Sequence, residues 1–196
     1  MHTLNIIVAV SSNGGIGFKG RLPWRLKKDM AFFKKITTDA RPGKFHSKKN
    51  SFRYLGLKNA VVMGRNTWDS IPEKAKPLPD RLNVIISSQL CSPPSGTYLV
   101  RSFTECMDLL NGDLRTQVDK VFIIGGSQLY KEIMQQTLYP VRIFCTHVEK
   151  HVECDTFFPE VNWDKLKQLR LPEVPSEPVE ENGYSYRFVV YEYGTQ

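Results

Sequence analysis

Five short segments of this 196-residue chain are rich in apolar residues, most of them near-continuous aliphatic runs, and they restrict the possible folds more than any other feature. In chain order they are residues 4–10, 59–63, 82–87, 120–124 and 141–148. Strands that are buried on both faces have this composition, because neither face needs polar residues. Segments of helical periodicity lie between several of them, at about 26–38, 103–110 and 127–135. We therefore expect a mostly parallel sheet with helices on both faces.

Two further strands are expected beyond these five. Residues 97–100 form a short apolar run, and residues 184–193 alternate like a strand with one exposed face. We expect 184–193 to pair in a hairpin with the segment near 166–171, which adds an antiparallel tail to the sheet. Because no repeat, linker or low-complexity segment interrupts the chain, we predict one α/β domain over residues 1–196.

A basic segment at about residues 40–58 separates a predicted helix from a predicted strand. It contains six lysines and arginines and no acid, so it accounts for most of the net charge of +7. We interpret it as an exposed loop inserted into the domain. The alternative is a nucleic-acid-binding module that uses this loop, which would bind with steep salt dependence. The sequence shows no base-reading motif that would favour it.

The sequence carries no mark of secretion or of a membrane. No apolar run approaches the ~20 residues of a membrane span, and the N-terminus lacks a signal-peptide pattern. The four cysteines are scattered without a CxxC pair, so we expect free thiols in the cytoplasm and no membrane partner. Cys145, His147, His151 and Cys154 lie close in sequence, but their spacing matches no usual zinc pattern, and we expect no metal.

Residues 15–20 (Gly-Ile-Gly-Phe-Lys-Gly) match the G-x-G-x-x-G pattern of dinucleotide-binding folds. In those folds the glycines open a helix, and an acid ends the next strand about 20 residues later. Here Pro23 prevents a helix, and Asp39 follows a predicted helix rather than a strand. We therefore reject this fingerprint and interpret residues 13–24 as a mobile glycine-rich flap over the end of the first strand.

Four predicted strands end in groups that suit an anion. Gly125-Gly126 and Gly64-Arg65-Asn66-Thr67 stand at strand-to-helix junctions, whereas Ser87-Ser88 and Arg101-Ser102 follow two other strands. Helix N-termini and guanidinium groups both bind phosphate. Ligands of parallel sheets bind at the carboxyl ends of the strands. This pattern indicates a long phosphorylated cofactor that crosses the sheet edge.

One acid stands in an apolar part of the chain. From about Leu26 the sequence reads as a helix, with Leu26, Met30 and Phe33 at helical spacing on an apolar face. Asp29 shares that face. Because desolvation raises the pKa of a carboxyl group, Asp29 is a candidate for binding or catalysis. The alternative is that Asp29 faces solvent beside Lys28.

Taken together, a series of motifs resembles the dihydrofolate reductase family, in the family's order and over nearly the whole chain. The motifs are Ile-Val-Ala-Val at 7–10, Gly-Ile-Gly at 15–17, Leu-Pro-Trp at 22–24, Asp29 with Phe33, Met-Gly-Arg-Asn-Thr-Trp at 63–68, Ser-Ile-Pro at 70–72, Pro-Leu-Pro-Asp-Arg at 77–81, Ile-Gly-Gly-Ser-Gln-Leu-Tyr at 124–130 and Asp-Thr-Phe-Phe-Pro at 155–159. The size and the longer loops are closest to the eukaryotic form. The resemblance implies an eight-stranded, mostly parallel sheet and the NADPH-dependent reduction of 7,8-dihydrofolate.

The resemblance also implies a substrate site. Asp29 is similar to the family's active-site acid, often Glu in eukaryotic members, with Thr146 supporting it and with Leu22 and Trp24 as further catalytic residues. A carboxylate suits the paired donors on a pterin edge. The implied substrate-binding residues are Val8, Ala9, Asp29, Met30, Phe33, Ser70, Ile71, Leu78, Arg81, Ile124, Tyr130 and Thr146. Arg81 would clamp the α-carboxylate of the substrate's glutamate, and family members often carry Phe where Met30 stands.

The cofactor site is implied in the same way. Its residues are Ala9, Ile16, Gly17, Gly64, Arg65, Asn66, Thr67, Ser87, Ser88, Arg101, Ile124, Gly125, Gly126, Ser127, Gln128, Leu129 and Tyr130. The first three would lie near the nicotinamide, and Arg65 and Arg101 would meet the 2′-phosphate. Asn66 and Ser88 occupy places where relatives often carry Lys or Arg, and the family has a cis bond at the position of Gly125-Gly126.

The implied reaction is hydride transfer to pterin C6 with protonation at N5. Asp29 would lie on the far edge of the pterin, so a water molecule is the expected proton donor while Asp29 polarises the ring. We expect dihydrofolate and antifolate inhibitors as ligands, and a monomer. The alternative is a reductase of this fold that acts on another pterin or pyrimidine, and Arg81 distinguishes the two because only a glutamate-tailed substrate needs its clamp.

Overall fold

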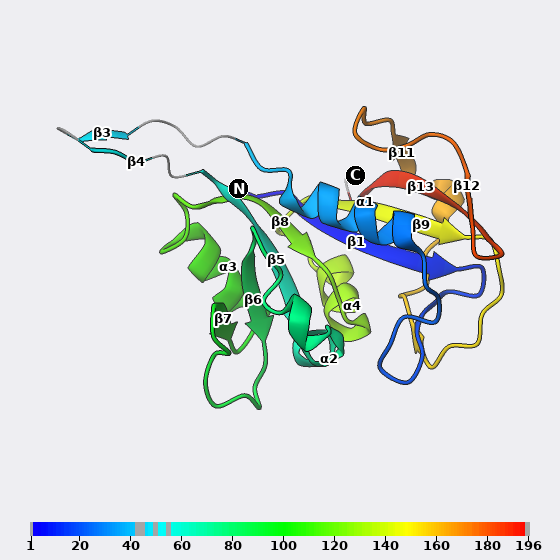
Figure 1. Ribbon diagram of the computed structural model, residues 1–196, viewed down its shortest axis with the longest axis horizontal. Coiled ribbons are helices and arrows are strands. Elements are labelled where there is room, and N and C mark those ends of the chain that lie inside the picture. The colour runs from blue at the N-terminus through cyan, green and yellow to red at the C-terminus, as the bar shows by residue number, and fades with distance from the viewer. Residues whose placement is uncertain (1, 42–45, 49–50, 54–55, 195–196) are drawn as a thin grey trace.

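Eight strands lie side by side in one sheet, in the order β11-β13-β9-β1-β8-β5-β6-β7, and β12 pairs with β13 off this path. The computed structural model describes residues 2–41, 46–48, 51–53 and 56–194 (Figure 1). The strands of this sheet are β1 (Leu4–Ser11), β5 (Lys58–Gly64), β6 (Leu82–Ile86), β7 (Thr97–Val100), β8 (Val118–Ile123), β9 (Val141–Val148), β11 (Lys167–Leu169), β12 (Val179–Glu181) and β13 (Tyr184–Tyr193).

The helices connect or flank these strands. They are α1 (Lys27–Thr38), α2 (Arg65–Ser70), α3 (Phe103–Asn111) and α4 (Ser127–Gln135), with short 3-10 turns η1 (Glu73–Ala75) and η2 (Trp163–Lys165). None of the helices in the described part of the chain is both long and apolar enough to cross a membrane.

The aliphatic runs form the parallel centre of the sheet, as predicted. β1 pairs in parallel with both β8 and β9, and β5, β6 and β7 continue the parallel arrangement. β13 runs antiparallel to β9 and also pairs with β11, the expected partner near 166–171. The expected hairpin between these two strands was wrong, however: the strand that forms a hairpin with β13 is β12, and Asn182 and Gly183 connect the two. Both turn residues have positive φ (51° and 74°), as a two-residue hairpin turn requires.

The sheet separates two hydrophobic clusters. Along β1, Leu4 and Ile6 face the cluster that contains α3 and α4, whereas Ile7 faces the cluster that contains α1 and α2. This division follows from the alternation of side chains along a strand. Because both faces are covered, the central strands contain almost no polar residues, which explains the aliphatic runs in the sequence.

The rotation of α1 differs in part from the expectation. Its buried residues include Asp29, Phe32 and Ile36, whereas Met30 is 49% exposed. Met30 lies with Leu26 and Asp29 on the face that lines a cavity, as predicted, but Phe32, rather than Met30, packs into the core. The ring of Phe32 packs 4.1 Å, centroid to centroid, from that of Phe188 on β13. Asp29 remains on the buried face.

The glycine-rich loop and the basic insertion contain more structure than expected. Within the loop, β2 (Gly15–Gly17) pairs with β10 (Thr156–Phe157), so the predicted mobile flap is attached to a distant segment. A Cβ on Gly15 would lie 2.3 Å from Cys154 Sγ, so only glycine permits this approach. Within the insertion, β3 (His46–Lys48) and β4 (Ser51–Arg53) form a two-stranded ribbon, and the rest of residues 42–55 lies outside the described residues.

Candidate active site

A cavity of about 350 Å³ opens beside the first turn of α1. Its lining residues are Leu22, Trp24, Arg25, Leu26, Lys27, Asp29 and Met30. Most of its exposed lining is apolar, and Asp29 is the only carboxylate among these residues. The cavity therefore combines a mostly apolar lining with a single carboxylate, which suits an apolar heterocycle that has donors on one edge.

Asp29 is buried, with 8% of its surface exposed. Its Oδ1 atom accepts a hydrogen bond of 2.7 Å from the hydroxyl of Thr146 on β9. Burial raises the pKa of Asp29 from 3.8 to about 6, the Thr146 hydrogen bond opposes this shift, and the negative charge of Glu181 adds to it. A carboxyl group with such a pKa changes its protonation state close to neutral pH, which is a common property of functional sites.

Two predicted catalytic residues border Asp29 in the cavity. Leu22 is 51% exposed at the opening, whereas Trp24 is 7% exposed. The indole N–H of Trp24 is buried and has no hydrogen-bond partner among the described residues. Buried donors are nearly always hydrogen-bonded, so this N–H is available for a ligand or a water in the cavity.

Arg81 is also buried, with 7% of its surface exposed. Its Nη1 donates to the hydroxyl of Thr37 over 2.8 Å, and its Nε donates to the carbonyl of Pro79 over 2.9 Å. The guanidinium carbon lies 5.9 Å from the centre of the Phe33 ring. These contacts fix the guanidinium beside α1 and suit it to a carboxylate ligand.

The remaining predicted substrate residues divide between the two faces of the sheet. Ala9, Ile71, Leu78 and Ile124 are partly buried and pack on the same cluster as Trp24, Leu26, Phe32 and Phe33. Val8 packs in the opposite cluster, so its side chain faces away from Asp29 because adjacent strand residues point to opposite faces. Ser70 is exposed, and its hydroxyl donates to the carbonyl of Thr67.

The two glycine-containing strand ends lie side by side. The N–H of Gly64 donates to the carbonyl of Gly125 over 2.8 Å, and the Gly125-Gly126 bond is cis, as the resemblance implied. Gly125 has φ of 128°, and a Cβ there would lie 2.9 Å from Thr67 Oγ1. A larger residue is therefore excluded, and the backbone leads directly into the N-terminus of α4.

The predicted phosphate-binding cations are exposed, in contrast to Arg81. The Arg65 guanidinium contacts Asp69 at 3.2 Å and Gln89 at 2.6 Å. Arg101 donates from Nη1 to the carbonyls of Ser87 and Leu90, at 2.8 and 2.6 Å. Exposed residues in the same region are Asn66, Ser88 and Gln128.

Several predicted cofactor residues have structural contacts of their own. The hydroxyl of Tyr130, which is 3% exposed, donates to the carbonyl of Ile7 over 3.0 Å. Leu129 is buried, and Ile16 packs against the same cluster. The hydroxyl of Ser127 donates to the carbonyl of Phe157, which connects α4 to the flap through β10. Gly17 pairs with Thr156 in the same small sheet.

The four residues considered as a metal cluster do not converge. His147 Nε2 lies 2.8 Å from the hydroxyl of Tyr191, and its ring packs edge-on against Trp163. Cys145 is buried in the core. Among the described residues, no group of three or more potential ligands could hold a metal ion.

Sequence analysis did not predict every residue of the site. Arg25, Leu26 and Lys27 line the cavity, but two of them are polar residues of the kind that normally faces solvent. Their position just before Asp29 is the only local signal. Thr37, the partner of Arg81, was not predicted because threonine near a helix end is common and carries no signature.

Comparisons with known proteins agree with the implied family. The dihydrofolate reductase family matches residues 3–42 and 40–193. The dihydrofolate reductase of Schistosoma mansoni is 53% identical over 190 residues, which cover 96% of this chain and 95% of that protein. That of Sus scrofa is 42% identical, with 98% of each chain covered. A solved structure of the Schistosoma mansoni protein has a TM-score of 0.85 at 52% identity and covers 98% of each chain. Similarity at this level over nearly the whole length, together with the matching sheet, shows that the chain belongs to the dihydrofolate reductase family of enzymes.

Proposed function

We propose that this enzyme reduces 7,8-dihydrofolate to 5,6,7,8-tetrahydrofolate with NADPH as the reductant. The observation that carries the proposal is the buried carboxylate of Asp29 in an otherwise apolar cavity, held by Thr146. The relatives named dihydrofolate reductase support the same substrate. Such a product would supply one-carbon metabolism and thymidylate synthesis.

Asp29 binds the pterin through the two oxygens of its carboxylate, and Oδ1 can accept a bond from the pterin in addition to the one from Thr146. A carboxylate accepts two parallel hydrogen bonds from the amino group and ring N–H on one pterin edge. Leu22, Trp24 and Met30 cover the ring faces and exclude water. The hydrogen bonds to Asp29 and the apolar contacts on the ring faces together hold the ring in one orientation. Correct orientation of two bound reactants accounts for a large part of the rate enhancement.

The residues at the strand ends fit NADPH. Gly125 and Gly126 allow Thr67 to pack closely against this turn, and the backbone there opens α4, whose N-terminal N–H groups suit a pyrophosphate. Arg65 and Arg101 supply cations for the 2′-phosphate. When bound, NADPH supplies the hydride that is added to pterin C6.

The protein's own groups control the proton that N5 receives. Asp29 contacts the edge of the pterin away from N5, so it does not donate the proton directly. Its carboxyl group polarises the ring and raises the basicity of N5, and a water molecule donates. The Trp24 N–H, which lines the same cavity and has no protein partner among the described residues, is a suitable anchor for polar groups in the closed site.

Arg81 binds the α-carboxylate of the substrate's glutamate. Its guanidinium is buried and already oriented by Thr37 and Pro79, so little rotamer freedom is lost on binding. Antifolates that carry the same pterin-like edge compete for Asp29.

We also propose a cytoplasmic monomer. All four cysteines are free, which suits a reducing compartment. Among the residues whose burial the structure describes, the exposed large hydrophobic ones are Leu22, Met30, Leu138 and Phe157. Two of them line the cavity, so they do not form a separate apolar patch for a partner.

The test is the loss of NADPH absorbance when the purified protein is mixed with dihydrofolate, repeated with NADH. We expect rapid turnover with NADPH and little with NADH. Equal activity with both would show that Asn66 and Ser88 have relaxed the choice of cofactor. No turnover with either, in folded protein that binds NADPH, would contradict the substrate and favour another pterin or a pyrimidine.

A further inference from the structure

The turn between β12 and β13 lies against the start of α1, although 154 residues separate Lys27 from Glu181. Glu181 Oε1 accepts the backbone N–H of Lys27 over 2.8 Å, and Oε2 accepts that of Lys28 over 3.1 Å. One carboxylate therefore binds two successive donors at the N-terminus of the helix that carries Asp29.

The helix has no cap of its own. Its N-cap residue, Leu26, has an extended backbone and no side chain that can accept a hydrogen bond. The first N–H groups of a helix lack partners inside the helix, and the helix dipole favours a negative charge beside them. Glu181 thus supplies from another part of the chain the group that Ser, Thr or Asp usually supplies locally.

Glu181 is itself held from two sides. The hydroxyl of Tyr186, a residue with no exposed surface, donates to Glu181 Oε2 over 2.7 Å. The next residue, Asn182, donates from its side-chain amide to the carbonyl of Arg25 over 2.7 Å. Because Arg25 and Lys27 line the cavity with Asp29, the turn contacts the same short segment that forms the cavity wall.

We propose that Glu181 is a positioning residue for Asp29: its carboxylate fixes the first turn of α1 and thereby fixes where the Asp29 carboxyl group lies in the cavity. The inference rests on the proposed function. Asp29 is the third residue of α1, so a change in the first turn reaches it directly. An orientation error of this kind weakens substrate binding even though no substrate contact is removed.

The charge of Glu181 acts in the same place. The other titratable groups around Asp29 are Cys145 on β9 and Tyr186 on β13, and burial raises the pKa of both, so both are neutral near pH 7. On the chain segment that carries Asp29, the charged residues next to it are Arg25, Lys27 and Lys28. The hydrogen bond from Tyr186, with those from Lys28 and Lys27, lowers the pKa of Glu181, so it stays ionised. Its negative charge then raises the pKa of Asp29.

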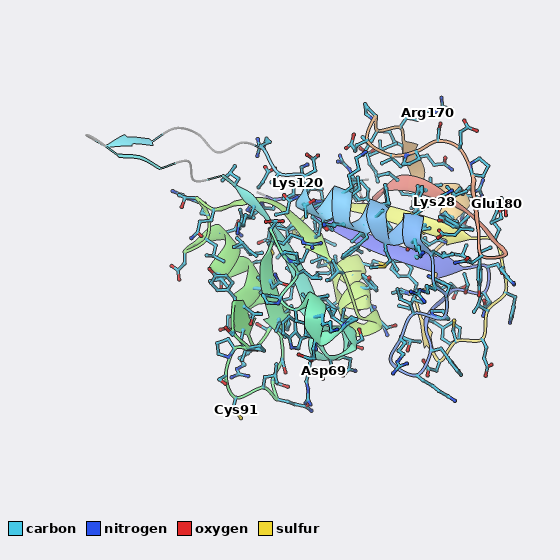
Figure 2. All side chains as sticks on the ribbon, viewed as in Figure 1. Lys28, Asp69, Cys91, Lys120, Arg170 and Glu180 are labelled. Atoms are coloured by element: carbon cyan, nitrogen blue, oxygen red, sulfur yellow. The ribbon has the colours of Figure 1, made fainter. Side chains whose placement is uncertain are left out.

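Glu181→Gln tests the proposal, with Glu180→Gln as the matched control. Glu180 is the exposed neighbour on β12, visible at the right of Figure 2, and its side chain makes no hydrogen bond or ion pair among the described residues. Two quantities are measured: the pH titration of the Asp29 carboxyl carbon by 13C NMR in ligand-free protein, and KM for dihydrofolate and for NADPH.

In Glu181→Gln we expect the Asp29 titration to move to lower pH and the KM for dihydrofolate to rise about five-fold, the order expected for loss of a helix cap. The KM for NADPH should not change, and Glu180→Gln should resemble the wild type in every measurement. The proposal would be overturned if Glu181→Gln and Glu180→Gln had the same midpoint of the Asp29 titration and the same KM for dihydrofolate.

Two further variants keep the test decisive. Glu181→Asp retains the charge, so its Asp29 titration should return toward the wild-type midpoint. If Glu181→Gln does not fold, Tyr186→Phe removes only the hydroxyl that holds Glu181 and should change the same two quantities in the same direction by a smaller amount. An unchanged titration and KM in folded Tyr186→Phe would contradict the proposal. Absence of dihydrofolate turnover in the wild type would contradict the proposed function alone, since the titration does not depend on turnover.

Discussion

The two sides of the site differ in how the protein holds its charged groups. On the proposed substrate side, defined by Asp29, Thr146 and Arg81, both charged residues are less than 10% exposed, at 8% and 7%. On the proposed cofactor side, defined by Arg65, Arg101 and the strand end at Gly125, the guanidinium groups are exposed, with 44% of the Arg65 side chain accessible. In Figure 2, Lys28 marks the first turn of α1 on one side, and Asp69 marks the end of α2 on the other.

The difference is one of electrostatics. A buried charge loses hydration, so it is stable only with fixed partners, and its interaction with a ligand is strong because little water screens it. An exposed cation keeps its hydration and is screened by salt. We therefore expect substitutions on the substrate side to have large effects that salt does not change, and substitutions on the cofactor side to have graded effects that salt weakens.

The largest effect is expected for Asp29→Asn. The amide cannot carry the charge that polarises the pterin, so turnover at neutral pH should fall by about 100-fold or more, while the Kd for NADPH stays the same. Steady-state kinetics and NADPH fluorescence titration measure the two quantities. Asp113→Asn, at an exposed acid, is the control. Wild-type turnover in Asp29→Asn would remove the role assigned to this residue.

The next effect concerns Arg81→Ala. Loss of charge-assisted hydrogen bonds to a carboxylate should raise the KM for dihydrofolate by about 10- to 100-fold, and salt should not alter this ratio. Arg170→Ala, at an exposed position labelled in Figure 2, serves as the control. A KM that is unchanged in Arg81→Ala would favour a substrate without a glutamate tail.

A smaller effect is expected on the cofactor side for Arg65→Ala. This variant is cleaner than one at Arg101, whose guanidinium also binds two backbone carbonyls. The KM for NADPH should rise about ten-fold at low salt and less at high salt, because the contact is exposed. The KM for NADH should not change. If salt has no influence on the ratio between Arg65→Ala and wild type, the contrast between the two sides is wrong.

The last expected effect is on stability rather than on kinetics. The pKa of Asp29 is raised in the folded protein from 3.8 to about 6, so the folded state binds more protons than the unfolded state between these values, and stability falls as pH rises through this range. Above pH 6 the ionised carboxyl costs up to about 3 kcal/mol. Asp29→Asn should therefore be more stable than wild type at pH 7.5 and equal to it below pH 4. Thermal unfolding at the two pH values measures this, and lower stability of the variant at pH 7.5 would contradict it.

Most strands could be predicted from the sequence, because a strand that is buried on both faces is apolar over most of its length. The runs at 4–10 and 141–148 match β1 and β9 within a residue. The proposal of Asp29 and Arg81 as site residues also came from local motifs, and the structure buries both side chains. The rotation of α1 did not, because Met30 and Phe32 are both apolar and only packing against Phe188 decides which one is buried.

What the sequence by itself determined is therefore the parallel sheet, the family and most of the chemistry that its side chains can perform. Only the tertiary structure decided which faces meet: that Val8 points away from Asp29, that Arg25 and Lys27 line the cavity, and that Glu181 caps α1. The physical reason is the distance along the chain over which each kind of interaction acts. Periodicity and turn residues report local conformation, whereas a hydrogen bond between Lys27 and Glu181 depends on how segments 154 residues apart pack together.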